Sequence, residues 1–320
     1  MKKYLYTFIL FILLLSTPIT VSAEKPVINK SSVTILCGKT YKLKANQKVS
    51  WKSSDKNIVS INSNGKITGK GYGVALITAV NKKGEKSICK IIVKKYIVKN
   101  TGNKRYPKIV TIHISGKKYR TYKVYNQKGF GSSYLNQRGC SHSSAAMVMS
   151  AYGKNYDSLD IHNGSVNKKC SEQYALKKLN KKVAITGKSL SVYSVSQILN
   201  NSGVKCHPVY KYKNANAIKE ITNNLNEGRP VLIMCSRKTV NGVKLAKSYH
   251  FLVLIGIDEN GYAIVLNAAG GTVNTSHCTG AFKLTVKELV ENHMWSCTGS
   301  GYKSFYFNGS KNYGGYIIID

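Results

Sequence analysis

Acidic residues are scarce in this chain. Its 320 residues include 13 Asp and Glu against 49 Lys and Arg, which gives a formal net charge of +36. The basic residues are spread along the chain, mostly single or in pairs among Asn, Ser and Tyr, so they do not form a basic arm. No nucleic-acid-binding motif accompanies them, and we therefore expect no nucleic-acid partner. A charge of this kind favours anionic polymers of a cell envelope as partners.

Long apolar runs are also absent after the first 23 residues. Lys2 and Lys3 precede the apolar run "YTFILFILLL", and "VSA" ending at Ala23 offers a cleavage site of small residues. The run is short for a membrane-spanning helix, and Pro18 follows it, so we expect cleavage instead of anchoring. The pattern predicts a signal peptide over residues 1–23. The mature protein should be secreted, either extracellular or associated with a cell wall, without a stable membrane span.

The spacings of common zinc sites are missing as well. The sequence contains neither C-x-x-C nor H-E-x-x-H. His293 and Cys297 are four residues apart, with His277 and Cys278 nearby, but this spacing fits no common zinc finger. We therefore expect no metal and no organic cofactor.

Residues 24–96 consist of short alternating runs separated by turns. Alternation of Val, Ile, Leu and Tyr with Lys, Ser and Thr, together with the turn "SNGK", predicts an antiparallel β-sandwich. Cys37 and Cys89 lie near the two ends of this region and could be joined by a disulfide, which the sequence leaves open. The region resembles the group 2 bacterial immunoglobulin-like domain at Trp51, Ser53, Ser54, Asp55, Gly65, Gly69, Gly73, Ile77 and Thr78. The resemblance implies an all-β immunoglobulin-like fold, with Trp51 in its core, that serves as a surface or adhesion module.

The rest of the chain has a different pattern. Residues 97–120 are expected to be a linker, "KNTGNKRYPK", followed by an entry β-hairpin around "SGKK". From residue 121 to 320, helical patterns come first, among them "CSEQYALKKLNKK", and apolar strands follow. Helices followed by an antiparallel sheet are typical of an α+β domain.

The stretch "NQRGCSHSSAAMVMSAYG" places Cys140 behind Gly139 at the start of a predicted helix. A buried cysteine is often only a core residue. The alternative is that Gly139 clears space for a substrate and that the helix N-terminus favours a thiolate. In that case the Cys140 thiol should ionise well below the value of about 8.5 that is typical of a free cysteine. His142 lies two residues further along the helix, so it points away from Cys140 and is a surface or packing residue.

A better partner for such a thiol is His250, in the apolar run "SYHFLVLIGIDENGYAIVLNAAG". If "DENG" closes a two- or four-residue hairpin, Asn267 lies opposite Leu252 or Leu254, on the same face of the sheet as His250. A three-residue loop would move Asn267 to the other face. His250 and Asn267 can also be read as a core histidine and the start of a turn.

The order Cys140, His250, Asn267 resembles that of the papain-like cysteine peptidases. Together with "VYNQKG", "GRPVLIM" and "YAIVLNAAGG", it is similar to the double-glycine, bacteriocin-processing-type peptidase family over residues 122–271. The resemblance implies an α+β papain-like cysteine peptidase domain over residues 121–320. Cys140 would be the nucleophile, His250 the base and later the acid, and Asn267 the residue that orients the His250 ring. A glutamine, Gln127 or Gln137, would donate to the oxyanion, and the local pattern favours Gln127.

The predicted protein is therefore a multidomain secreted cysteine peptidase that hydrolyses a peptide or protein substrate. Two alternatives stay open. One is a papain-like hydrolase of cell-wall peptides, although such enzymes usually pair the cysteine with two histidines. The other is a non-catalytic surface adhesin with a decayed peptidase fold.

Overall fold

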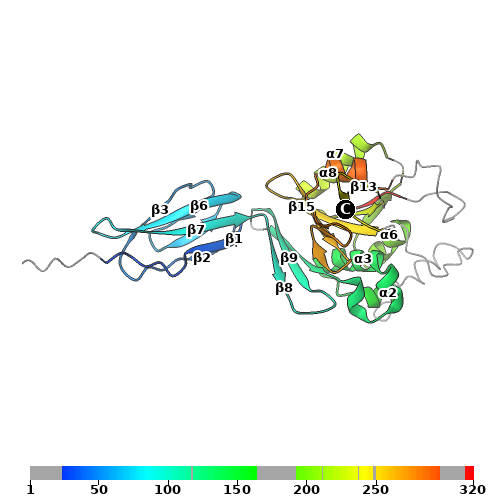
Figure 1. Ribbon diagram of the computed structural model, residues 1–320, viewed down its shortest axis with the longest axis horizontal. Helices are drawn as coiled ribbons and strands as arrows, with labels where there is room; N and C mark the ends of the chain where they lie inside the picture. Colours follow the sequence, from blue (N-terminus) through cyan, green and yellow to red (C-terminus); the bar gives the residue numbers. More distant parts are fainter. Residues whose placement is uncertain are drawn as a thin grey trace, which may run out of the picture. The chain divides into compact units, whose positions relative to one another are not determined.

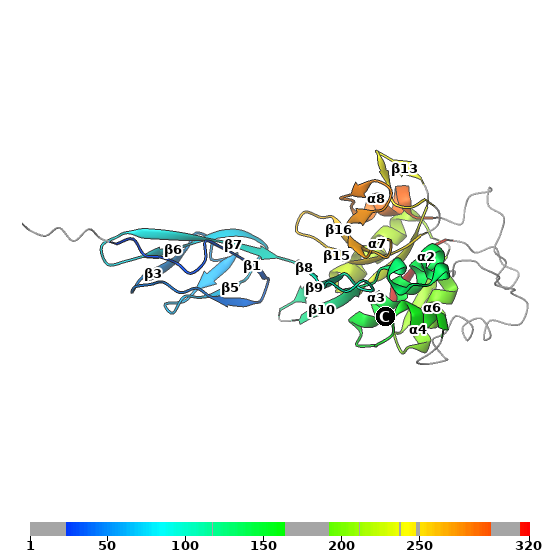
Figure 2. The ribbon, with the colours of Figure 1, turned by 60° about the horizontal axis from the view of Figure 1, so that its bottom comes forward.

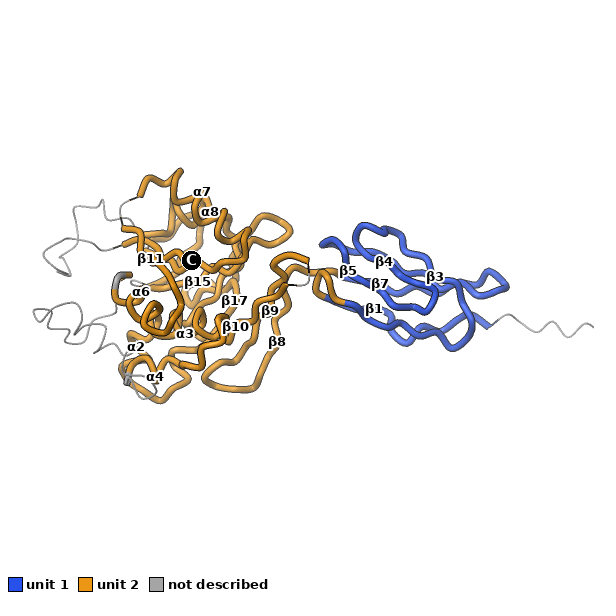
Figure 3. The backbone as a smooth tube through the Cα atoms, turned by 180° about the vertical axis from the view of Figure 1, so that it is seen from behind, with its two compact units in different colours: residues 1–35, 40–92 blue, residues 36–39, 93–320 orange. Residues whose placement is uncertain are grey.

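The computed structural model describes residues 24–116, 118–163, 192–210, 212–236, 238–247, 250–295 and 314–320. The expected signal peptide and the helix expected at "CSEQYALKKLNKK" lie outside these residues, as does Cys297. The chain divides into two compact units (Figure 3). Unit 1 comprises residues 1–35 and 40–92, and unit 2 comprises residues 36–39 and 93–320. Among the described residues, no helix is long and apolar enough to cross a membrane.

Unit 1 consists of two sheets. The first has the strand order β1-β7-β6-β3 and the second the order β2-β5-β4. Most neighbouring strands are antiparallel, but β1 runs parallel to β7, since the amide of Lys90 donates to the carbonyl of Ser31 and the amide of Cys37 to that of Lys94. Side chains alternate between buried and exposed along β6, with Ala75, Ile77 and Ala79 buried, because successive residues of a strand face opposite sides of a sheet. The strands are β1 (Ser32–Leu36), β2 (Thr40–Lys42), β3 (Ser50–Ser53), β4 (Val59–Ile61), β5 (Lys66–Gly69), β6 (Gly73–Val80) and β7 (Lys86–Lys94).

One sequence expectation for this region needs correction, and one possibility that the sequence left open is decided. Trp51 is half-buried instead of fully buried, and its indole ring packs against the backbone at Gly65, where a Cβ would lie 3.3 Å from the ring. No disulfide joins the described cysteines, so the bridge between Cys37 and Cys89 is not formed.

The segment expected to be a linker begins with a strand. Residues 97–100 belong to β8 (Tyr96–Asn100), which pairs with β9 (Lys108–Ser115) in an antiparallel sheet of order β10-β9-β8. The predicted hairpin around Gly116 joins β9 to β10 (Lys118–Val124). Their buried side chains, among them Val110 and Tyr122, belong to the same core as the helix that follows. The low hydrophobicity of "KNTGNKRYPK" indicates a linker, but strand pairing with β9 orders its first residues.

Unit 2 is built around a six-stranded antiparallel sheet with the order β11-β20-β12-β15-β16-β17. One face packs against α3 and α6 through residues such as Phe251 and Val253, and the other packs against α7 and η3 through Leu252 and Leu254. Figures 1 and 2 show α3 and α6 on one side of β15 and α7 on the other. A strand buried on both faces is a continuous apolar run, as in "HFLVLIGI".

The helices of unit 2 are η1 (Gln127–Phe130), α2 (Ser133–Arg138), α3 (Cys140–Ala151), α4 (Ser158–Asn163), α6 (Val192–Asn201), α7 (Asn214–Asn226), α8 (Val286–Glu288) and the π-helix η3 (Leu289–His293). The strands of the main sheet are β11 (Cys206–Val209), β12 (Val231–Cys235), β15 (His250–Ile257), β16 (Ala263–Asn267), β17 (Thr272–Val273) and β20 (Tyr316–Ile319). Short hairpins pair β13 (Thr239–Val240) with β14 (Val243–Lys244), and β18 (Thr275–Ser276) with β19 (Gly280–Ala281).

The β15–β16 hairpin reaches the predicted register by an unexpected route. Ile257 lies opposite Ala263, and the Asp258 amide donates to the carbonyl of Tyr262, so the loop has three residues, the length that should move Asn267 to the wrong face. A β-bulge between Leu254 and Gly256 then adds one residue to β15 and restores the parity. Asn267 consequently lies opposite Leu252, on the side of the sheet that bears His250.

Candidate active site

Most of the catalytic residues predicted from the sequence line one pocket of about 430 Å³. Cys140 and His250 both line it, and Gln127 and Gln137 line it as well. Asn267 is buried behind His250. The remaining lining residues are Asn126, Lys128, Asn136, Ala246, Lys247, Ala269, Gly270 and His277.

Cys140 is the first residue of α3, and 5% of its surface is exposed. The helix packs against β15, where the Ser144 hydroxyl donates to the carbonyl of Phe251 over 3.3 Å. This packing holds the start of α3 beside the start of β15, which carries His250. The first N–H groups of a helix have no partner within it, so the start of α3 also offers backbone donors beside the thiol.

Gly139 has a different role from the expected one. A Cβ on Gly139 would lie 2.5 Å from the carbonyl oxygen of Leu135 and 2.9 Å from its Cα. The residue therefore lets the last turn of α2 pass close to the start of α3, and it does not clear space for a substrate.

The expected low pKa of Cys140 is wrong. Burial raises the pKa of the Cys140 thiol above its ordinary value, and this effect exceeds the opposing one of nearby backbone hydrogen bonds. Desolvation disfavours the thiolate, because a charged group loses more hydration free energy than a neutral thiol when it leaves water. The helix N-terminus at Cys140 does not outweigh that cost.

His250 begins β15 and is buried. Its Nε2 lies 2.7 Å from Oδ1 of Asn267. Burial lowers the pKa of His250, and the hydrogen bond to Asn267 raises it by a smaller amount. The imidazole is therefore neutral at neutral pH. Asn267 provides a hydrogen-bond partner for its Nε2. Without that partner, the buried nitrogen would cost about 1–3 kcal/mol of stability.

Three hydrogen bonds determine how the Asn267 amide is oriented. Its Nδ2 donates to the carbonyl of Thr275 over 2.9 Å, and its Oδ1 accepts from the backbone N–H of Ala269 over 2.9 Å. A flipped amide would place two donors together at Ala269 and two acceptors together at Thr275. Oδ1 therefore faces His250, so the ring must carry its proton on Nε2, and Nδ1 is left as the acceptor.

Gln127 is buried beside this pair, whereas Gln137 is exposed. The backbone N–H of Gln127 donates to the carbonyl of Ala268, which ties η1 to the residue that follows Asn267. Its Nε2 donates one proton to the carbonyl of Asn136 over 3.0 Å. An amide NH₂ has two protons, so one remains for a group in the pocket.

Two family models match the chain. The model of the peptidase C39 like family matches residues 119–293, more than half of the 320 residues. The chain belongs to the peptidase C39-like family. The model of the bacterial Ig-like domain (group 2) matches residues 16–91.

Among solved structures, the chain is similar to a mutant of intimin from EHEC O157:H7 and to an intimin–Tir90 complex. The first match has 21% identity and a TM-score of 0.21, and it covers 26% of this chain and 54% of that chain. The second has 22% identity and a TM-score of 0.21, and it covers 24% and 50%. The chain thus spans about half the length of these structures. No curated protein matches the chain.

This peptidase C39-like chain has a second histidine at the pocket, which the sequence reasoning missed. The ring centroid of His277 lies 5.6 Å from that of His250, in an edge-to-face arrangement. Burial and, to a smaller extent, the charges of His250, Lys247 and Lys128 lower the pKa of His277. The place of His277 at the pocket could not be predicted from the sequence, because it depends on the path of the chain after β17. No group of three possible metal-binding side chains occurs in the described parts of the chain.

His142 is a packing residue. It is buried, and its ring lies edge-to-face with Tyr134 and with His162 at centroid distances of 5.8 and 5.6 Å. Cys235 and Cys206 are buried in strands β12 and β11.

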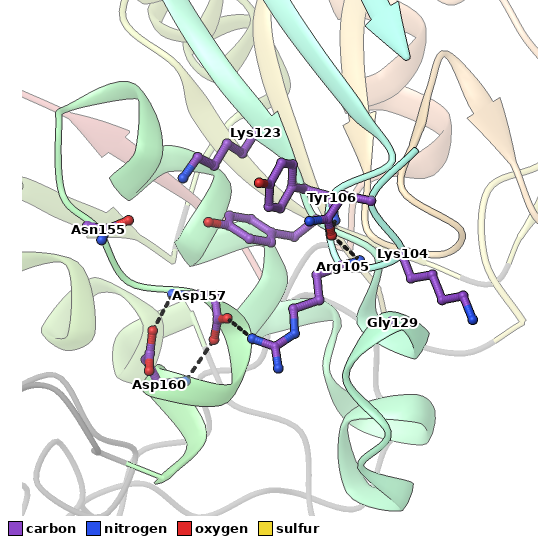
Figure 4. Close-up of a pocket in the computed structure, with 10 residues that line it drawn as sticks. Lys104, Arg105, Tyr106, Lys123, Gly129, Asn155, Asp157 and Asp160 are labelled. Atoms are coloured by element: carbon purple, nitrogen blue, oxygen red, sulfur yellow. Dashed lines mark hydrogen bonds and ion pairs between the residues drawn. The ribbon is translucent and has the colours of Figure 1, made fainter. Parts of the chain in front are cut away.

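A second pocket, of about 590 Å³, is larger, but its described lining residues include no cysteine or serine (Figure 4). Arg105 forms a salt bridge of 3.1 Å with Asp157 there, and the rings of Tyr106 and Tyr125 meet edge-to-face. Among the residues described around this pocket, none is a histidine. The smaller pocket with Cys140 is therefore the candidate active site.

The raised pKa of Cys140 predicts how its alkylation depends on pH. A thiol with a raised pKa stays protonated at neutral pH, so the rate of reaction with iodoacetamide should keep rising above pH 9. The measurement is the rate of modification of Cys140 between pH 5 and 11, followed by peptide mass mapping, with the unfolded chain as the control. A rate that is already high and constant from pH 5 to 8 would indicate a thiolate–imidazolium pair and contradict the prediction.

Proposed function

We propose that this chain is an active cysteine peptidase with a papain-like catalytic domain, which hydrolyses peptide bonds through a thioester on Cys140. The observation that carries the proposal is one pocket lined by Cys140, His250 and Gln127, with the His250 ring held by Asn267. Family membership supports the class of activity.

The proton of the thiol is the first to move. With its own proton on Nε2, His250 can accept the thiol proton at Nδ1 as the sulfur attacks the carbonyl carbon of the substrate. The raised pKa of Cys140 means that the thiolate forms during this transfer and is not stored beforehand. Negative charge then develops on the carbonyl oxygen, where the second N–H of Gln127 Nε2 and the backbone N–H of Cys140 are suited to donate.

The tetrahedral intermediate collapses when the C–N bond breaks. The imidazolium of His250 gives its proton to the leaving amine, and an acyl group remains on the sulfur as a thioester. A water molecule then attacks the thioester carbonyl carbon while His250 takes one of its protons at Nδ1. The C–S bond breaks, and His250 returns this proton to the sulfur, which leaves the acid and the free thiol. Oδ1 of Asn267 accepts a hydrogen bond from the Nε2–H of His250 throughout, so Asn267 orients the ring and stabilises its charged form without taking up a proton.

These roles predict graded losses of turnover. Cys140→Ala and His250→Ala should each lower kcat/KM by about 10³-fold or more, since they act as one unit. Gln127→Ala should cost about 10²-fold, as is typical for loss of one oxyanion donor. Asn267→Ala should cost less than His250→Ala, because the base is retained.

The measurement is hydrolysis of a peptide library and of peptidoglycan by the purified chain, with folding checked by circular dichroism. Cys278→Ala is the matched control, because this thiol is partly exposed and does not line the pocket. Cleavage of peptidoglycan alone would favour a wall-peptide hydrolase. Undiminished hydrolysis by Cys140→Ala would contradict the mechanism, and hydrolysis of neither substrate would favour the adhesin.

We also propose that the protein is exported and held near a cell wall by its charge. Removal of residues 1–23 with Lys2 and Lys3 would change the net charge from +36 to 36 − 2 = +34. Charge-driven adhesion should weaken steeply with salt, because the Debye length falls from about 10 Å at 0.1 M to about 3 Å at 1 M. Sedimentation with wall fragments at both salt concentrations, with and without residues 24–92, is the measurement. Binding that persists at 1 M salt and is lost with residues 24–92 would contradict the charge proposal.

A further inference from the structure

The pocket that holds Cys140 is lined by two lysines and a histidine from three different segments. Lys128 belongs to η1, Lys247 lies between β14 and β15, and His277 follows β18. Three segments that are far apart in sequence thus bring basic side chains to one cavity. Among the described residues that line it, none is acidic.

Several acidic residues of unit 2 interact with groups outside the pocket. Asp157 pairs with Arg105, and Glu220 accepts a hydrogen bond from Tyr316. Asp258 accepts from the backbone of the β15–β16 loop, and Glu288 accepts from the backbone N–H of Thr285. Within the described part of the chain, no ion pair involves a lysine of the pocket. Of the 13 acidic residues, Glu172 is the one that the structure does not describe.

The charges of Lys128 and Lys247 affect the ionisation of His277. Lys247 and Lys128 both lower the pKa of His277, so they lie close enough for their charges to be felt at its ring. His277 is therefore neutral at neutral pH and presents N–H and acceptor groups, whereas the two lysines carry the charge. An anion in this cavity would relieve the repulsion and find hydrogen-bond donors on several sides.

We propose that Lys128, Lys247 and His277 form a subsite that selects peptides with an acidic side chain next to the scissile bond. This inference rests on the proposed function, because it assigns the substrate class of the same pocket. A carboxylate of Asp or Glu would meet two lysines there, whereas the uncharged amide of Asn or Gln would gain hydrogen bonds only. A basic side chain would be repelled, which adds discrimination against it.

The first arm of the test compares matched substrates. Peptides that differ only in Glu or Gln at each position flanking the scissile bond should show a preference for Glu of about tenfold or more at one position. The double variant Lys128→Ala/Lys247→Ala should reduce this preference to about twofold or less. The control Lys283→Ala/Lys287→Ala removes the same charge from exposed positions of unit 2 outside the pocket, and it should keep the preference.

The second arm does not depend on peptidase activity. Iodoacetate is anionic and iodoacetamide is neutral, so the ratio of their rates at Cys140 reports the charge of the pocket. At one fixed pH, with modification of Cys140 followed by mass mapping, the ratio should fall severalfold in Lys128→Ala/Lys247→Ala and stay unchanged in the control. His277→Gln, which retains hydrogen-bonding capacity, should change the ratio less at neutral pH than the lysine pair does.

The two arms separate the possible failures. If no peptide is cleaved but the ratio falls only in the pocket variant, the proposed function fails and the anionic subsite is supported. If peptides are cleaved without any preference for Glu, or if both double variants change the ratio equally, the subsite is overturned and the charge acts through the whole surface.

Discussion

The hydrogen bond between His250 Nε2 and Asn267 Oδ1 is the interaction on which the site depends. It is short, 2.7 Å, and it connects two buried side chains on neighbouring strands. Because hydrogen bonds to Thr275 and Ala269 fix the orientation of the Asn267 amide, His250 must be the donor and Asn267 the acceptor of this bond. That direction assigns the proton of the ring to Nε2 and leaves Nδ1 to accept one. A neutral asparagine does this without adding a charge to a buried pair, which a carboxylate would.

The fold supports this bond from both strands. The bulge between Leu254 and Gly256 sets the register that brings Asn267 opposite Leu252. Gly256 lies where a Cβ would be only 2.5 Å from Cδ1 of Ile112, so β9 packs closely against the hairpin at this point. On the other side, α3 packs on β15 and carries Cys140 at its first turn, and η1 is tied to Ala268 through the backbone of Gln127. Each element of the site is thus held by the core of unit 2 and not by a loop alone.

Much of this arrangement could be predicted from the sequence, because it rests on local patterns. Small and apolar residues after Cys140 predict the helix, and the paired apolar runs around "DENG" predict the hairpin. The bulge could not be predicted: one extra residue in a strand leaves no mark on an apolar run that is buried on both faces. The place of His277 and the role of Gly139 depend on long-range packing, and the raised pKa of Cys140 depends on burial that a helix N-terminus does not offset. The same limit applies to β8, whose polar residues are ordered by pairing with β9.

The most direct test of this account is the tautomer of His250, read from ¹⁵N chemical shifts of the histidine ring at neutral pH, assigned with a His250→Gln variant. The hydrogen bond to Asn267 predicts a neutral ring with the proton on Nε2, and a mixture of tautomers when Asn267→Ala removes the accepting oxygen. A proton on Nδ1, or an imidazolium at neutral pH, would contradict it, because Nδ1 would then be unable to accept the proton of Cys140.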